Sequence, residues 1–256
     1  MNKISAVIIT KNEQQNIRRC LNSLVDVVDE IIVVDSYSTD DTEKICNDFD
    51  VEFIKKEFED YSNSKNYGNS MAKHSFILSL DADEAISEEL KESLALVKSN
   101  LKQDGYSFNR RTNYCGQWIY HCGWYPDVKL RLFRKSKAKW EGKIHEILQV
   151  SSDKKAHLKG DLLHYSYPNL SRHAEKMDLF TEMAARDLFE KKKKVSTLKL
   201  IVAPMFEFFK KYILYRGFLD GYYGFIISIM SSYYKFFKYS KLKNLWIKHN
   251  TLSSNK

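Results

Sequence analysis

The sequence is poor in the residues that build linkers. Only nine glycines and three prolines occur among 256 residues, and no internal repeat or low-complexity stretch is present. Modules joined by linkers need segments rich in glycine, serine or proline. Hydrophobic residues make up 43% of the chain, enough for a full core. We therefore expect a continuous globular body and no modules on linkers.

Cysteine is also scarce. The four cysteines are Cys20, Cys46, Cys115 and Cys122. They are too few and too scattered for a disulfide framework, and Cys115 and Cys122 lack a second pair at zinc-ligand spacing. We expect free thiols in a reducing cytoplasm. The N-terminal segment passes directly into a strand-like run, so we also expect no secretory signal peptide.

Long apolar runs are missing. The longest uncharged stretch in the C-terminal part, from Gly221 to Tyr234, has 14 residues. A helix that crosses the hydrocarbon layer of a membrane needs roughly 20. We therefore expect no transmembrane helix.

The net charge of +8 is concentrated at one end of the chain. Residues 1–185 hold 26 Lys and Arg against 29 acids, whereas residues 186–256 hold 15 against 4. Such asymmetry favours a polyanionic partner, either nucleic acid or an anionic membrane. The basic residues lie among large apolar ones, and no recognised nucleic-acid motif is present. We expect no nucleic-acid partner, and a peripheral protein on the inner face of the plasma membrane. Alternatively, these helices pack on the rest of the chain and the lysines are simply solvated.

Short apolar runs alternate with helix-like segments through the first hundred residues. Runs of four to six residues, many of them β-branched, are typical of buried strands. We predict strands over Ile4–Ile9, Glu30–Val34, Val51–Ile54 and Phe76–Leu80. Helical spacing predicts helices over 13–24 and 62–73, and a further helix starting at Ser38–Asp41. This repetition predicts an α/β fold with a mostly parallel sheet and flanking helices.

The pattern changes after residue 100. Residues 105–150 are typical of antiparallel strands and loops, and they follow a helix that Ser87 is expected to cap. We predict a last strand over Asp161–Tyr167 and a charged amphipathic helix over 171–194. Pro204 suits the first turn of a further helix in a basic, aromatic C-terminal extension.

Polar side chains follow three of the predicted strands. Thr10 to Glu13 follow the first, Asp35 the second, and Asp81 and Asp83 the fourth. Ligands of open α/β sheets bind at the carboxyl ends of the strands, where these residues would meet. A divalent cation, Mg²⁺ or Mn²⁺, would reconcile carboxylates with a bound diphosphate. Asp35 could equally cap a helix, and Asp-x-Asp is common in loops.

These residues belong to longer runs that resemble a known family. AVIITKNEQQNI, DEIIVVDSYSTDDT and SLDADE resemble the nucleotide-sugar-binding core of family 2 inverting glycosyltransferases, which have the GT-A fold. Further on, GWYPDVKLRLFRK, WEGKIHE, LLHYSY and RGFLDGYYG are similar to one branch, the bacterial lipopolysaccharide-core β-1,4-glucosyltransferases. The resemblance covers about residues 3–240. The Gln-x-x-Arg-Trp motif of processive synthases is absent, which argues against polymer synthesis with export.

The resemblance implies a role for each matching residue. Thr10, Asn12 and Glu13 would line the nucleoside pocket, and Asp35 would bind the base. Lys65 would meet the donor near its phosphates, although alone it could be a solvated surface lysine. Asp81 would contact the ribose or the metal shell, Asp83 would bind the metal, and His164 would join the metal or the diphosphate. Glu146 would be the catalytic base, unless it merely pairs with a nearby Lys or Arg.

The implied organisation is a catalytic domain over residues 1–194, followed by an amphipathic helical region over 195–256. The catalytic domain would comprise a nucleotide-sugar-binding half, 1–100, and an acceptor-binding half, 101–170. Candidate acceptor contacts are Trp124, Tyr125 and Trp140, whose rings suit sugar C–H surfaces, and Arg131, which suits an anionic acceptor. The aromatic residues could equally be core, and Arg131 could be ion-paired on the surface.

The implied reaction moves a hexose, with UDP-glucose as the default donor, to a lipopolysaccharide-core or other lipid-linked saccharide. A sugar nucleotidyltransferase is the alternative enzyme, but such enzymes usually open with a glycine-rich phosphate loop, and TKNEQQN has no glycine. The non-enzymatic alternative is a basic protein that binds membranes or nucleic acid.

Overall fold

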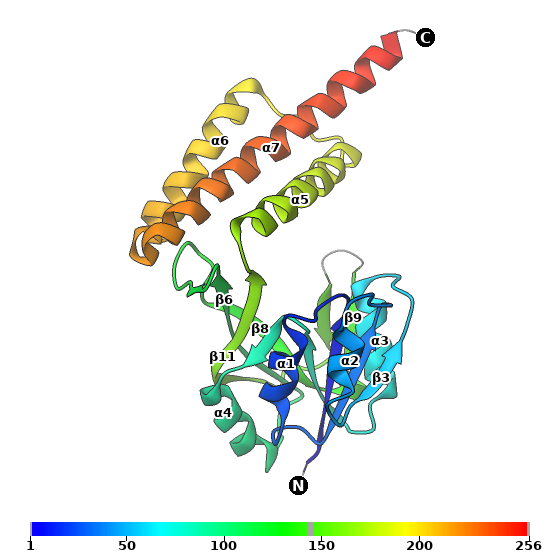
Figure 1. Ribbon diagram of the computed structural model, residues 1–256. Helices are drawn as coiled ribbons and strands as arrows, with labels where there is room; N and C mark the ends of the chain where they lie inside the picture. Colours follow the sequence, from blue (N-terminus) through cyan, green and yellow to red (C-terminus); the bar gives the residue numbers. More distant parts are fainter. Residues whose placement is uncertain (1, 143–145, 255–256) are drawn as a thin grey trace. The chain divides into compact units, whose positions relative to one another are not determined.

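The computed structural model describes residues 2–142 and 146–254. The chain forms two compact units (Figure 1). The first comprises Met1–Arg111 and Pro126–Tyr165, and the second Thr112–Tyr125 and Ser166–Lys256. The predicted division into a catalytic domain over 1–194 and a helical region over 195–256 stays a prediction. The chain passes between the units three times: inside β6 (Gly105–Tyr114), between Tyr125 and Pro126, and inside β11 (Lys155–Tyr167).

Four parallel strands form the first half of the first unit. They are β1 (Ile4–Thr10), β2 (Glu30–Asp35), β3 (Glu52–Lys55) and β4 (Phe76–Asp81), in the order β3-β2-β1-β4. The helices between them are α1 (Ile17–Leu24), α2 (Thr42–Cys46) and α3 (Tyr61–Met71). Ile4, Ala6 and Ile8 of β1 pack in one apolar cluster and Val7 in another, because both faces of the sheet are covered. The predicted α/β fold is confirmed.

The sheet continues with antiparallel strands, as predicted for residues 105–150. Its order is β3-β2-β1-β4-β8-β6-β11-β5, with β8 (Asp127–Arg134) beside β4 and β5 (Glu84–Ile86) at the far edge. The short strand β7 (Gln117–Trp118) pairs with β6, and β9 (Ala138–Glu141) forms a separate hairpin with β10 (Ile147–Val150). Ser87 caps α4 (Glu88–Lys98) as expected, since its hydroxyl accepts a bond from Leu90 N at 3.2 Å.

Gly68 sets how closely α3 approaches the sheet. A Cβ atom at this position would lie 2.5 Å from Val7 Cγ1 and 3.0 Å from Val34 Cγ2. Only glycine therefore lets the helix lie against β1 and β2 at this distance. Lys65 lies three residues earlier on the same helix and is carried into the protein with it; its side chain is fully buried.

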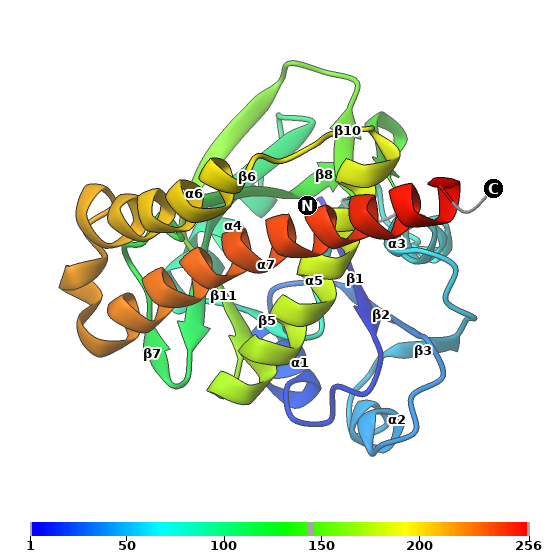
Figure 2. The same cartoon turned by 90° about the horizontal axis from the view of Figure 1, so that it is seen from above.

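The second unit is mainly helical. Its helices are α5 (Leu170–Glu190), α6 (Thr197–Phe209) and α7 (Gly221–Ser254), with a π-helical turn (Lys210–Leu214) and a 3₁₀ turn (Gly217–Asp220) between α6 and α7. In both views α7 lies between α5 and α6 (Figures 1 and 2). In the part of the chain that the structure describes, no helix has the length and apolar character to traverse a bilayer.

Pro204 lies inside α6, so its prediction for the first helical turn is wrong. The helix begins earlier, at Thr197, because Ser196 caps it by accepting a bond from Lys199 N at 3.2 Å. Proline has no N–H and leaves one carbonyl of the preceding turn without its usual bond.

The prediction of free thiols agrees with the structure, in which all four cysteines are free.

Candidate active site

The polar strand ends meet at one edge of the sheet, as predicted. Thr10 at the end of β1 lies opposite Asp35 at the end of β2, and Ile9 lies opposite Asp81 at the end of β4. Parallel strands bring their carboxyl ends to the same edge, which is where open α/β sheets bind ligands. Asp35 and Asp81 are therefore separated only by β1.

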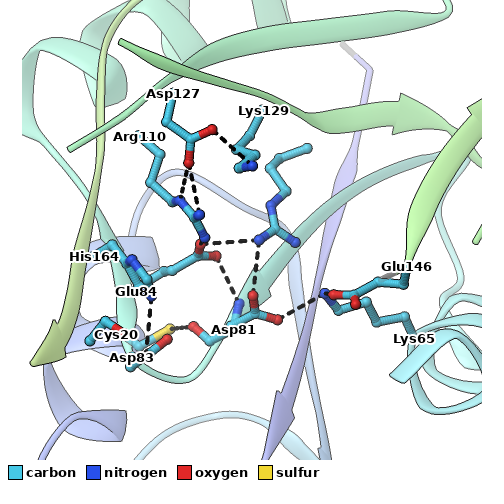
Figure 3. Close-up of polar contacts among 12 residues, drawn as sticks. Cys20, Lys65, Asp81, Asp83, Glu84, Arg110, Asp127, Lys129, Glu146 and His164 are labelled. Atoms are coloured by element: carbon cyan, nitrogen blue, oxygen red, sulfur yellow. Dashed lines mark hydrogen bonds and ion pairs between the residues drawn. The ribbon is translucent and has the colours of Figure 1, made fainter. Parts of the chain in front are cut away.

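Lys65 joins two carboxylates at this edge (Figure 3). Its Nζ lies 3.0 Å from Asp81 Oδ1 and 2.9 Å from Glu146 Oε1. The ammonium also lies 4.5 Å from the centre of the Trp140 ring, in cation–π contact. The side chain is buried, so it is not the solvated surface lysine that the sequence alone allowed. The buried ammonium favours the charged form of the Asp81 carboxylate.

The neighbouring residue, Asn66, fixes the hairpin that carries Glu146. Asn66 Nδ2 donates to Trp140 O at 2.8 Å, and Trp140 N donates to Asn66 Oδ1 at 3.0 Å. Trp140 belongs to β9, and Glu146 directly precedes β10. Consecutive residues of α3 thus hold the hairpin backbone and the Glu146 carboxylate. Residues 143–145, which complete the Lys-Ile-His-Glu element, lie outside the described residues.

Asp81 receives a second cation from β8. Arg131 Nη2 lies 2.9 Å from Asp81 Oδ2 and 3.0 Å from Glu84 Oε1. Burial would raise the pKa of Asp81, but Lys65 and Arg131 together hold this pKa well below its usual range. The charged form of Asp81 is therefore favoured, and both of its oxygens face cations of the protein.

Asp83 and His164 form a separate pair. His164 Nε2 lies 3.4 Å from Asp83 Oδ2, and His164 lies opposite Glu84 where β11 pairs with β5. The carboxylate oxygen suits Mg²⁺ or Mn²⁺, and the imidazole nitrogen can serve as a further ligand. Within residues 2–142 and 146–254 no cluster of three or more His, Cys, Asp or Glu side chains is arranged to hold a metal ion. A metal bound by this pair would need its other ligands from phosphate and water.

The predicted nucleoside loop is tied to the loop after β2. Asn12 N donates to Ser38 Oγ and Thr39 N donates to Asn12 Oδ1, both at 2.8 Å. Asn12 has a left-handed backbone with φ of 54°, a conformation that Asn adopts more readily than most residues. The buried Asp35 carboxylate accepts a bond from Ser38 N at 2.8 Å. Asp35 therefore shapes this loop, whether or not it also binds a base.

Buried polar atoms that lack a hydrogen-bond partner occur at several of the predicted site residues. Within the described chain they include Thr10 Oγ1, Arg131 Nε and Nη1, Trp140 Nε1 and His164 Nδ1. Most buried polar groups in proteins are paired, so such a set is typical of a site that completes its bonds with a ligand.

A family model for glycosyl transferase family 2 matches residues 5–150, more than half of the chain. The chain belongs to glycosyltransferase family 2. An uncharacterised glycosyltransferase of Rickettsia typhi is 31% identical, over 99% of this chain and 91% of that protein. The lipopolysaccharide core biosynthesis glycosyltransferase LpsC of Rhizobium meliloti is 25% identical, over 93% and 91%. A crystal structure of residues 1–349 of TarS from S. aureus covers 96% of this chain and 92% of that one, at 16% identity and a TM-score of 0.46.

Sequence reasoning gave no role to three charged residues of this family 2 site. Glu84 is buried and accepts bonds from Asp81 N at 3.0 Å and from Arg110 Nη1 at 3.2 Å. Arg110 Nη2 in turn donates to Asp127 Oδ2 at 2.7 Å. A signal was present in β8, because Asp127, Lys129 and Arg131 recur at every second residue and so share one face of the strand.

The predicted acceptor contacts belong to different units. Arg131 and Trp140 lie within the first unit, and both are almost fully buried, beside Asp81 and Lys65 respectively. Trp124 belongs to the second unit, where it packs against Tyr114 and Tyr167 in an aromatic cluster. Tyr125 also belongs to this unit and lies near Tyr120, with 5.9 Å between their ring centres. Acceptor contact stays a prediction for all four.

Proposed function

We propose that this family 2 glycosyltransferase moves a hexose from a nucleoside-diphosphate sugar to a saccharide acceptor, with inversion at the anomeric carbon. The observation that supports it most strongly is the position of Lys65, which joins Asp81 at the end of β4 to Glu146. This contact brings the candidate base to the sheet edge where a donor would bind.

Glu146 is proposed as the general base. An acceptor hydroxyl is a poor nucleophile at neutral pH, and a carboxylate in hydrogen-bonding reach accepts its proton as the C–O bond forms. The Glu146 side chain is 22% exposed, so one of its sides can meet an acceptor while Oε1 stays bonded to Lys65. Attack from the face opposite the departing diphosphate inverts the anomeric centre.

The donor is proposed to lie along the strand ends. Thr10, whose buried hydroxyl lacks a partner among the described residues, would line the nucleoside pocket with Asn12 and Glu13. Asp35 would bind the base, and UDP-glucose is the default donor. Both carboxylate oxygens of Asp81 already face cations of the protein, Lys65 and Arg131, which disfavours a metal ion there. Of the two roles expected for Asp81, contact with the ribose is therefore proposed and not a place in the metal shell.

Asp83 and His164 would hold a divalent ion, Mg²⁺ or Mn²⁺. The pair offers one oxygen and one nitrogen ligand, and the buried His164 Nδ1 has no partner within the described residues. The ion would supply positive charge for the departing diphosphate. Lys65 and Arg131 already balance Asp81, so donor phosphates would not face an unneutralised carboxylate there.

A lipopolysaccharide-core or other lipid-linked saccharide is the proposed acceptor class. It is suggested by LpsC, whose name assigns that protein to lipopolysaccharide core biosynthesis and which is similar over nearly the whole chain. A lipid-linked acceptor would require the enzyme to work at a membrane surface.

The proposed base can be tested with Glu146→Gln, which keeps the size of the side chain but removes its basicity. We expect the turnover number for sugar transfer to fall about 10²- to 10⁴-fold, while donor affinity changes less than about twofold. The donor is first chosen by thermal-shift screening of nucleotide sugars with and without Mn²⁺. Release of nucleoside diphosphate in the presence of acceptor then gives turnover.

Glu141→Gln is the matched control. Glu141 lies in the same hairpin as Glu146, on β9, and its side chain is exposed. It should retain wild-type turnover. Wild-type turnover in Glu146→Gln would remove Glu146 from the mechanism, and failure of every nucleotide sugar to bind would remove the proposed reaction.

A further inference from the structure

An apolar stripe on α6 is exposed. Its members lie at intervals of three and four residues, on one side of the helix, and are 48–71% exposed. They are Leu198, Ile201, Val202, Met205, Phe206 and Phe209. In soluble proteins a stripe with this spacing normally faces the core. Here α6 packs on α7 through other residues and leaves the stripe uncovered within the second unit.

A second exposed stripe lies on α7, again at intervals of three and four residues. It consists of Tyr222, Phe225, Ile229, Tyr233 and Phe236. Ile213, Leu214, Phe218 and Leu219, in the turns between the two helices, are also exposed. Exposed apolar surface of this extent marks an interaction site. We call all of these residues together the apolar face.

Both stripes lie on the same side of the helix pair. The helices are antiparallel and touch where Ser232 Oγ donates to Pro204 O at 2.8 Å. The next residue on each helix, Met205 and Tyr233, is exposed. Each step of one residue along a helix turns the side-chain direction by about 100° around the helix axis. In an antiparallel pair, one step forward from the contact point on each helix therefore turns both side chains to the same side of the pair. The apolar face is therefore continuous across α6 and α7.

The segment that carries the apolar face is strongly basic. Residues 195–256 contain ten Lys and Arg and only two acids, Glu207 and Asp220. Both acids are engaged within the second unit. Glu207 lies 3.7 Å from Lys235, and the buried Asp220 accepts bonds from His121 N and His121 Nδ1 at 2.8 and 2.9 Å. The charge that this segment presents outward is therefore positive.

Lysine and tyrosine side chains are interleaved on these helices and in the turn between them. Lys199 lies over Tyr239, Lys210 over Tyr215 and Lys238 over Tyr239, with 4.8–5.4 Å between each ammonium and ring centre. Both residue types have an apolar body and a polar tip. They are the side chains that proteins place at the level of lipid headgroups.

We propose that the apolar face docks on the surface of a bilayer that contains anionic lipid, with its apolar side chains at the acyl boundary. The positive charge selects this occupant over a second copy of the chain, since two copies would bring like charges together. The described helices cannot traverse a bilayer, so the segment lies on it. The surface is argued from the second unit alone and does not depend on the proposed reaction.

Flotation with vesicles tests the docking surface. The full chain is mixed with vesicles of phosphatidylcholine alone, or of phosphatidylcholine and phosphatidylglycerol, at low and at high salt. We expect flotation with the anionic vesicles, and at least about tenfold weaker binding to the zwitterionic ones and at high salt. The double variant Met205→Gln, Phe206→Gln changes no charge and should weaken binding to anionic vesicles about tenfold or more.

Leu96→Gln is the matched control, because Leu96 is 78% exposed on α4 of the first unit. It should float like the wild type, and circular dichroism melts should show that all variants fold. Wild-type flotation of the double variant, or no flotation of the wild type, overturns the proposal. The proposal is also overturned if the wild type is a dimer without lipid and the double variant is a monomer. That result would assign the apolar face to contact with a second copy of the chain. Donor turnover is measured on the same samples, so docking and transfer can fail separately.

Discussion

A substitution that removes the Lys65 ammonium would distinguish between two possible roles of this residue. The resemblance to family 2 enzymes implies contact with donor phosphates, whereas the structure bonds Lys65 to Glu146 and Asp81. Lys65→Met keeps the length of the side chain and deletes only the charge. If Lys65 acts through Glu146, the variant should lose turnover; if it acts on the donor, the variant should lose donor affinity.

The structure sets the size of the expected effect. A hydrogen bond to a charged group contributes about 1.5–3 kcal/mol, which corresponds to roughly a 10- to 100-fold fall in turnover. Asp81 keeps Arg131 as a partner after the substitution. The free energy of unfolding should therefore fall by about 2 kcal/mol, less than the 3–5 kcal/mol typical of a buried charge left alone.

The assay is a double-mutant cycle with Glu146→Gln, in which turnover, KM and donor Kd are measured for each variant. Because both changes disable the same base, the double variant should turn over within about threefold of Glu146→Gln alone. Donor Kd should stay within about threefold throughout. Fully additive losses in turnover, or a tenfold loss of donor affinity in Lys65→Met, would refute the reasoning.

Two further predictions concern pH and metal. Burial lowers the pKa of His173 to about 4, so its neutral form stabilises the second unit fully above pH 6.5, and this contribution is lost as the pH falls towards 4. Urea unfolding, followed through the fluorescence of the adjacent Trp124, should show that the free energy of unfolding falls by about 1–3 kcal/mol over this range. In His173→Phe the free energy of unfolding should depend less on pH. An unchanged pH dependence in this variant would contradict the assignment. Electron paramagnetic resonance of free Mn²⁺ should show at least about tenfold tighter binding with UDP than without it, because the Asp83–His164 pair is the proposed metal site and no group of three or more ligands occurs among the described residues. His164→Ala should abolish this gain, and tight binding without nucleotide would contradict the model.

The parallel strands and their polar ends could be predicted because the signals are local. The buried run before Asp81 has the length of a strand, and the carboxyl ends of parallel strands share one edge by geometry. This argument alone places Thr10, Asp35 and Asp81 at that edge, and the strand register confirms their positions.

The network around these positions could not be predicted because it depends on distant pairings. Glu84 meets Arg110 and Arg131 across 26 and 47 residues of sequence, through strands whose order no local pattern encodes. Lys65 and Glu146 are 81 residues apart. These two units could not be predicted because two of the three crossings between them lie inside strands, β6 and β11, and the third, at Tyr125–Pro126, has a single proline and no linker-like segment.

Gly68 links the packing of the core to the geometry of the reaction. The missing Cβ would lie about an ångström inside the normal contact distance from Val7, so any larger residue would push the helix outwards. Lys65 would move with it, away from carboxylates that it now reaches at 2.9 and 3.0 Å. The alignment of the proposed catalytic centre therefore depends on a glycine with no chemistry of its own, which a survey of polar residues alone would overlook.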